Sequence, residues 1–142
     1  MKHQKIYEKV DNEKRDNIIQ SLSTILSGEE NILFAYLHGS FQEELPFRDL
    51  DIAVYLKEAP QKEQLDFELK LEDKIEQIIK YPIDLKVLNH APVSFGYMVI
   101  KKGKKLLVRN DSGRAAFETA TLKKYFDFLP YRERYLKEVL NA

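Results

Sequence analysis

The sequence predicts a mixed α/β (α+β) fold, with a small mixed β-sheet, helices packed on one face of it, and further helices at the C-terminus. Segments 33–56 and 81–88 contain stretches in which apolar residues recur at every second position, as is typical of strands. Segment 60–80 between them carries apolar residues at helical spacing on a charged background. Such a crossover lets the flanking strands lie parallel or antiparallel. At 142 residues, the chain is expected to form one domain over residues 1–142.

The N-terminal part predicts one helix and the first strand. Asp11 or Asn12 is placed to cap a helix that runs to about Leu26, because apolar residues recur there three and four positions apart. Ser27-Gly28 is expected to end this helix, since glycine commonly follows the last helical residue. Residues 31–38 form the first strand, and their almost continuous apolar character indicates burial on both faces.

The central strand is expected to open with an acidic pair, Asp49 and Asp51. Residues two apart on a strand project from the same face, so these carboxylates point together while the apolar residues between and after them point the other way. Neighbouring carboxylates repel each other, and so hydrophobic a strand would hold them at a high cost in free energy without a cation between them.

A third carboxylate, Asp84, lies in the alternating segment 81–88. The apolar residues of this segment share one face of the expected strand, and Asp84 lies on the other. If this strand pairs beside the strand of Asp49 and Asp51, the three carboxylates converge. Oxygen ligands of this kind suit one or two Mg²⁺ ions, which usually complete their coordination with water and substrate phosphates.

Gly39 and Ser40 are expected to form the turn after the first strand. Glycine lets the backbone approach a ligand closely, and the Ser40 hydroxyl with nearby N–H groups can hold phosphate oxygens. Two residues near this turn have open roles. His38 is either a structural histidine or a substrate contact, and Arg48 forms either a surface salt bridge or a phosphate contact.

The second half of the chain is predicted to be mainly helical. Pro60 to Lys80 is interpreted as one helix whose charges form a solvated face. Pro130 is expected to break or kink the C-terminal helix, because proline lacks the backbone N–H. The other expected elements are a helix over Val93–Lys102, a strand over Lys105–Arg109, a helix over about Gly113–Leu129 and a final helical piece over Tyr131–Leu140.

Two clusters of side chains have alternative interpretations. The basic one is either a set of solvated lysines around a turn or a patch that faces a triphosphate or an acidic partner. The aromatic one is expected to lie mostly in the core, with some members in an exposed patch for a protein partner. The basic residues are Lys101, Lys102, Lys104, Lys105, Arg109 and Arg114, and the aromatic residues are Tyr125, Phe126, Phe128, Tyr131 and Tyr135.

The composition excludes several classes of protein. The 23 basic and 23 acidic residues cancel, so direct nucleic-acid binding is not expected. The absence of cysteine excludes disulfides and thiolate zinc sites and is compatible with a reducing cytoplasm. The N-terminus lacks the apolar core of a signal peptide, and the longest apolar run, residues 32–37, is far shorter than the ~20 residues that span a membrane. A cytoplasmic location without membrane contact is therefore expected.

Gly39-Ser40, the following eight residues, the pair Asp49 and Asp51, and Asp84 on a later strand together resemble the signature of the polymerase-β-type nucleotidyltransferases. The small size and the C-terminal half resemble the minimal nucleotidyltransferase (MNT) antitoxins of HEPN–MNT toxin–antitoxin modules. The resemblance implies that the three aspartates are catalytic and bind two Mg²⁺ ions, and that Gly39 and Ser40 bind the nucleotide. It also implies that ATP is the substrate, and that AMP passes to a tyrosine of a cognate HEPN ribonuclease toxin.

Other functions remain open at this level. An antitoxin that inhibits its toxin by stoichiometric binding would need no catalysis, although all three acidic residues are present. Transfer of a nucleotide to a small molecule is a further alternative, but 142 residues leave little room for the additional domain that usually holds such an acceptor. A nucleic-acid polymerase fits the zero net charge poorly. The last alternative is that the three aspartates are solvated on the edge of a sheet and have no catalytic role.

Overall fold

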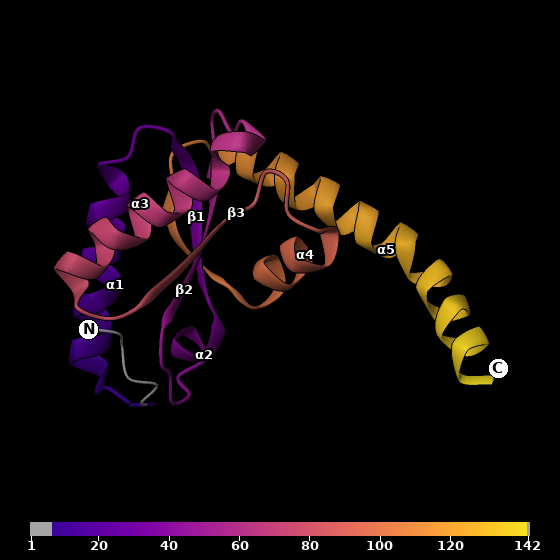
Figure 1. Cartoon of the computed structure of the whole chain (residues 1–142), viewed down its shortest axis with the longest axis horizontal. Coiled ribbons are helices and arrows are strands. Elements are labelled where there is room, and N and C mark those ends of the chain that lie inside the picture. The colour runs from indigo at the N-terminus through magenta and orange to yellow at the C-terminus, as the bar shows by residue number, and fades with distance from the viewer. Residues whose placement is uncertain (1–6, 142) are drawn as a thin grey trace.

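The computed structural model describes residues 7–141, which fold around a four-stranded β-sheet (Figure 1). The predicted elements are present, with differences at the Gly-Ser turn and in the C-terminal helix. The helices are α1 (Asn12–Ser27), α2 (Gly39–Gln42), α3 (Gln61–Ile79), α4 (Val93–Lys102) and α5 (Asp111–Asn141), and the strands are β1 (Ile32–His38), β2 (Leu50–Leu56), β3 (Ile83–Val87) and β4 (Lys104–Val108).

The sheet is mixed, as predicted, with the strand order β3-β2-β1-β4. β1 pairs antiparallel with both β2 and β4, whereas β2 and β3 run parallel. The parallel pair depends on α3, because parallel neighbours need a long crossover connection. In the register of this pair, Asp51 of β2 lies beside Asp84 of β3. The topology therefore brings together two acidic residues that are far apart in the sequence.

Helices cover both faces of this sheet (Figure 1). α1 and α3 pack on the face where Leu37, Ile52 and their alternate neighbours are buried, which agrees with the expected helix-covered face. The C-terminal helices α4 and α5 pack on the opposite face, over Phe34 and Ala53. Because β1 is covered on both sides, nearly all of its residues are buried, as its continuous apolar pattern indicated.

The outer edge of β3 is covered by carboxylates of α3. Three glutamates one helical turn apart accept hydrogen bonds from alternate backbone N–H groups of β3, those that β2 cannot reach. The prediction that the charges of this helix form a solvated face was therefore wrong for these residues, and Glu68 is only 6% exposed. The hydrogen bonds run from Val87 N–H to Glu68 (2.9 Å), from Leu85 N–H to Glu72 (2.8 Å) and from Ile83 N–H to Glu76 (3.0 Å).

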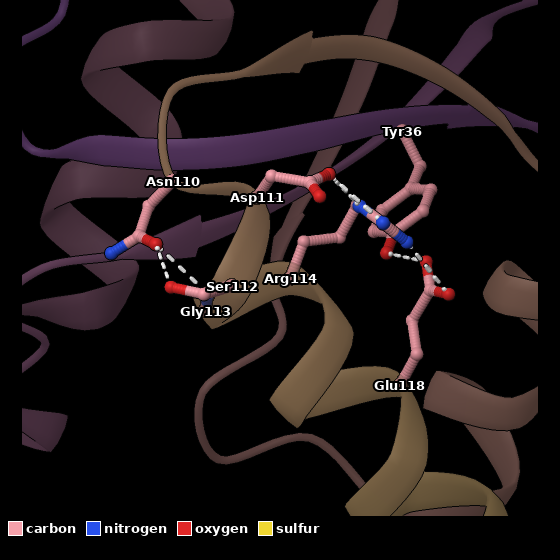
Figure 2. A network of polar contacts seen from close by, with 7 residues as sticks. All are labelled: Tyr36, Asn110, Asp111, Ser112, Gly113, Arg114 and Glu118. Atoms are coloured by element: carbon pink, nitrogen blue, oxygen red, sulfur yellow. Dashed lines mark hydrogen bonds and ion pairs between the residues drawn. The ribbon is translucent and has the colours of Figure 1, made fainter.

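The C-terminal helix α5 runs without interruption from Asp111 to Asn141, so the predicted break at Pro130 was wrong. Asn110 caps its start, where Oδ1 accepts the N–H of Gly113 at 2.9 Å (Figure 2). Proline removes one backbone hydrogen bond from a helix. Pro130 lies in an exposed part of α5, where water can hydrogen-bond the freed carbonyl, and the following Arg, Glu, Lys and Leu residues favour helix.

A polar network attaches the first turns of α5 to the sheet (Figure 2). The Tyr36 hydroxyl on β1 donates to Glu118 on α5 at 2.6 Å. Arg114 forms ion pairs with Glu118 at 3.0 Å and with Asp111 at 2.9 Å. Burial, followed by the hydrogen bond to the Glu118 carboxylate, raises the pKa of Tyr36, so this hydroxyl keeps its proton and acts as the donor.

The two arginines of the predicted basic cluster have structural partners. Arg109 donates to the carbonyl oxygens of Ile32 at 2.9 Å and Glu29 at 3.1 Å, which ties the end of β4 to the loop before β1. Arg114 belongs to the network with Glu118. The four lysines of the cluster are exposed, so only they are available to a phosphate or an acidic partner: Lys101, Lys102, Lys104 and Lys105.

The aromatic cluster lies mostly outside the core, which contradicts the expectation that most of its members are buried. Tyr125 is half-buried, where its ring stacks on Tyr97 with ring centroids 3.8 Å apart. The other members are exposed because the C-terminal half of α5 extends away from the sheet (Figure 1): Phe126, Phe128, Tyr131 and Tyr135. Within residues 7–141, no helix combines the length and apolar content that crossing a lipid bilayer requires.

Candidate active site

Asp51 and Asp84 form the centre of the candidate site. They are neighbours on parallel strands, and their side chains lie on the sheet face opposite to the buried Ile52 and Leu85. Burial is the main reason that the pKa of Asp51 rises from 3.8 to about 7. The charges of Asp49 and Asp84 and a hydrogen bond to Asp84 raise it further. Near neutral pH the Asp51 carboxyl therefore binds a proton more readily than an exposed aspartate does, and a cation would also be stabilised beside it.

Asp49 lies in a bend just before β2, whereas the sequence predicted it to be part of the strand. It still acts on the pair, because its charge raises the pKa of Asp51. In the part of the chain that the structure describes, no group of three or more His, Cys, Asp or Glu side chains is arranged to hold a metal ion. The three-aspartate metal site thus stays a prediction, with two members paired and the third coupled to them by charge.

Gly39 begins the short helix α2, where a turn was predicted, and it has a positive φ of 81°. A Cβ atom at this position would lie 2.1 Å from the Oδ2 atom of Asp51, so the Asp51 carboxylate rests against the Gly39 backbone. Only glycine fits both the conformation and this contact. Ser40 follows on the exposed side of the turn. The structure therefore connects the predicted phosphate-binding turn directly to the acidic pair.

His38 lies directly opposite Asp51, on the neighbouring antiparallel strand β1. The side chain is 6% exposed, and its ring packs edge-on against Phe95 of α4 with centroids 5.6 Å apart. Burial lowers the pKa of His38, although the charge of Asp84 opposes this shift. The Nε2 atom is buried and has no hydrogen-bond partner among residues 7–141. His38 is thus a neutral, packed residue at the edge of the site.

Arg48, whose role the sequence left open, has its guanidinium group 5.8 Å from the centre of the Tyr7 ring. This distance is within the range of a cation–π interaction. The positive charge of Arg48 lowers the pKa of Asp51, against the stronger effects that raise it. Arg48 therefore contributes positive potential next to the acidic pair.

Sequence reasoning missed three carboxylates of α3 that support this site by hydrogen-bonding the backbone of β3. Glu68, Glu72 and Glu76 hold the strand of Asp84 in place, and their spacing of four residues was the available signal. It was not recognised because evenly spaced glutamates on a helix usually face solvent.

Residues 20–112 match the family described as "Polymerase beta, Nucleotidyltransferase", and this span includes all five predicted site residues. A small mixed sheet with a glycine turn against paired aspartates is the type of site expected of a nucleotide-transferring domain. Since the match covers more than half of the chain, this protein belongs to the polymerase-β nucleotidyltransferase family. No curated protein matches the chain in sequence.

Solved structures of toxin–antitoxin complexes contain chains with the same fold. One is the tri-AMPylated Shewanella oneidensis HEPN toxin in complex with MNT antitoxin, with a TM-score of 0.71, 19% identity, and coverage of 89% of this chain and 98% of that one. A toxin–antitoxin with AMP-PNP has a TM-score of 0.73 and 21% identity, with coverage of 86% of this chain and 98% of that one. The toxin–antitoxin MntA–HepT has a TM-score of 0.67 and 20% identity, with coverage of 92% of this chain and 99% of that one. The predicted resemblance is confirmed for family and fold.

Proposed function

We propose that this protein is an antitoxin that transfers AMP from ATP to a tyrosine hydroxyl of a HEPN ribonuclease toxin and so inactivates it. The observation that carries the proposal is the pairing of Asp51 with Asp84 against the backbone of Gly39, within a nucleotidyltransferase domain. Similar folds occur in complexes with a tri-AMPylated HEPN toxin and with AMP-PNP, which supports both the nucleotide and the acceptor. On this proposal residues 1–142 act as one minimal nucleotidyltransferase domain in the cytoplasm, where ATP and RNA are present.

The donor set fits Mg²⁺. Asp49, Asp51 and Asp84 offer the carboxylate oxygens that this ion prefers. Burial is the main cause of the raised pKa of Asp51, and the charges of Asp49 and Asp84 that add to it are ones that a cation would neutralise. These residues would hold one or two ions, with Gly39 and Ser40 binding the β- and γ-phosphates. Bound Mg²⁺ would polarise the α-phosphate and neutralise the departing pyrophosphate. The chain supplies the rest, by orienting the triphosphate across the Gly39 turn.

The acceptor hydroxyl needs a base. A phenol has a pKa of about 10, so it is a weak nucleophile at neutral pH. We assign Asp84 to take its proton, because this carboxylate lies beside Asp51 on the same sheet face. The phenolic oxygen then forms a bond to the α-phosphorus, the bond from that phosphorus to the bridging oxygen breaks, and pyrophosphate leaves. The product is a tyrosine that carries AMP.

Stoichiometric inhibition is the second candidate. The exposed aromatic and aliphatic residues along the C-terminal half of α5 favour it, because such a surface suits a lasting protein contact. Transfer to a small molecule has no comparable observation in its favour.

Intact-mass spectrometry separates the two candidates. This protein would be incubated with ATP, Mg²⁺ and the HEPN-domain protein encoded beside it, and the toxin would then be separated and assayed for ribonuclease activity. We expect the toxin to gain the mass of AMP and to stay inactive after separation. The same incubation with Asp51→Asn serves as the control. An unmodified toxin that regains activity on separation would replace the transferase with a stoichiometric inhibitor.

A further inference from the structure

Residues 126–141, the C-terminal half of α5, form a helical arm that contacts α4 at its base, where the Phe126 ring packs edge-on against Tyr97 with centroids 5.9 Å apart. It extends away from the sheet in Figure 1, and every described residue from 131 to 141 is exposed. Many of these exposed residues are large and apolar, with Tyr131 66% and Leu140 82% exposed. A solvent-exposed helix that is merely a surface element carries few such residues. The exposed apolar residues of the arm are Phe126, Phe128, Tyr131, Tyr135, Leu136, Val139 and Leu140.

Four of the apolar residues of the arm lie along one side of the helix. Phe128, Tyr131, Tyr135 and Val139 are spaced by three and four residues, so they form one stripe, here called the arm face. Glu133 and Lys137, each two positions from a tyrosine of the stripe, lie about 200° around the helix. A stripe at this spacing matches the apolar side of another helix, and Tyr and Phe are the residues that protein interfaces favour. The arm face therefore suits a helical protein partner.

The arm continues the sheet face that carries the acidic pair. Phe117, near the start of α5, packs on Phe34 and Tyr55, which project from that same face. Between the site and the arm lies α4, whose Phe95 contacts His38. Two residues further along, Tyr97 stacks on Tyr125 at the base of the arm. A protein seated on the arm face would thus lie on the same side of the molecule as Asp51 and Asp84.

Positive charge gathers at the base of the arm. Lys123 and Lys124 precede it, whereas residues 126–141 themselves contain three Lys or Arg residues and three Asp or Glu residues. A helical partner with an apolar groove, and with acidic residues at the end that meets Lys123 and Lys124, would complement this surface. A small-molecule acceptor would make no use of such a surface.

We infer that the arm face is the docking surface for the protein acceptor, and that it binds an apolar helical groove of the HEPN toxin whose acidic end meets Lys123 and Lys124. This inference rests on the proposed function, which supplies the partner. The arm holds the toxin, and the acidic pair modifies it. Docking and transfer are then separate functions of one chain, so they can be lost separately.

Titration calorimetry of this protein with the HEPN-domain protein encoded beside it, without ATP, tests the inference. The double variant Tyr131→Ser/Tyr135→Ser should bind the toxin about tenfold more weakly or worse, because exposed tyrosines at an interface centre carry much of the binding free energy. The matched control, Glu133→Ser/Lys137→Ser, has the same spacing on the opposite side of the helix and removes one charge of each sign. It should bind within about twofold of wild type. Both variants should keep the wild-type melting temperature, because all four side chains are exposed.

Three results would overturn the docking inference. The first is equal affinity of both double variants for the toxin, and the second is no binding by the wild type. The third is a wild-type dimer in light scattering that Tyr131→Ser/Tyr135→Ser dissociates while toxin affinity is unchanged, since the arm face would then bind a second copy. A toxin that binds the wild type but never gains AMP would instead refute the proposed function and leave the docking surface standing.

Discussion

Glu72 on α3 accepts the backbone N–H of Leu85, the residue after Asp84, at 2.8 Å. Through this hydrogen bond α3, on one face of the sheet, holds β3, and β3 presents the candidate catalytic residue Asp84 on the other face. Burial is the main cause that raises the pKa of Glu72, and the charge of Asp84 adds to the shift. The adjacent residues Leu85 and Asp84 of β3 therefore link the two faces of the domain.

Replacing Glu72 tests this support. Glu72→Ala leaves the N–H of Leu85 without its acceptor, so the free energy of unfolding should fall by about 1–3 kcal/mol. Glu72→Gln keeps an acceptor oxygen and should lose clearly less. Urea denaturation of both variants measures the difference. If Glu72→Ala and Glu72→Gln are equally stable, the hydrogen bond does not hold β3.

Stability should depend on pH through Asp51. Its folded-state pKa is about 7 against an ordinary 3.8, so the folded chain binds this proton more tightly than the unfolded chain does. The contribution of Asp51 to the free energy of unfolding therefore falls as the pH rises from about 4 to about 7 and is level above that.

Asp51→Asn removes this dependence, because asparagine does not titrate. The stability of the variant relative to wild type should increase between pH 5 and pH 8, as measured by denaturation across this range in metal-free buffer. Parallel curves for the two proteins would show that Asp51 has an ordinary pKa. The exposed Asp66→Asn, whose carboxylate pairs with Lys70 at 2.9 Å, serves as the control.

Mg²⁺ or Mn²⁺ together with ATP should raise the melting temperature of the wild-type protein, because a ligand that binds only the folded state stabilises it by mass action. Asp49→Asn and Asp51→Asn should lose this increase and also lose AMP transfer, with the fold retained. Asp66→Asn should behave as wild type. Absence of any thermal shift at millimolar metal and ATP in the wild type would count against the metal site.

Gly39→Ala should disrupt both the turn and the acidic pair. The added Cβ would lie 2.1 Å from Oδ2 of Asp51, and alanine disfavours a φ of 81°. We expect a loss of ~1–3 kcal/mol in the free energy of unfolding and a weaker response to metal and ATP. The matched control is Gly28→Ala, since Gly28 has an ordinary φ of −77°. Equal stability of the two variants would refute the close packing of Asp51 on Gly39.

Local patterns in the sequence were sufficient for most of the elements and for the type of site. The alternation around Asp51 and Asp84 predicts both strands, and Gly39-Ser40 predicts a phosphate-binding turn, because side-chain period and glycine conformation are properties of short segments. The same patterns failed at Pro130, where the loss of one hydrogen bond was outweighed by favourable helical residues on both sides.

Sequence alone therefore determined the fold class and the helix between the strands, and it predicted the acidic residues of the candidate site. Tertiary structure decided which of them meet. The parallel register sets Asp84 beside Asp51 and leaves Asp49 in a bend, and packing turns Glu68 and Glu72 from presumed surface charges into hydrogen-bond acceptors for β3. It also leaves Phe126, Phe128, Tyr131 and Tyr135 in solvent, because α5 extends away from the sheet. Such outcomes depend on contacts between distant segments, which no short stretch of sequence encodes.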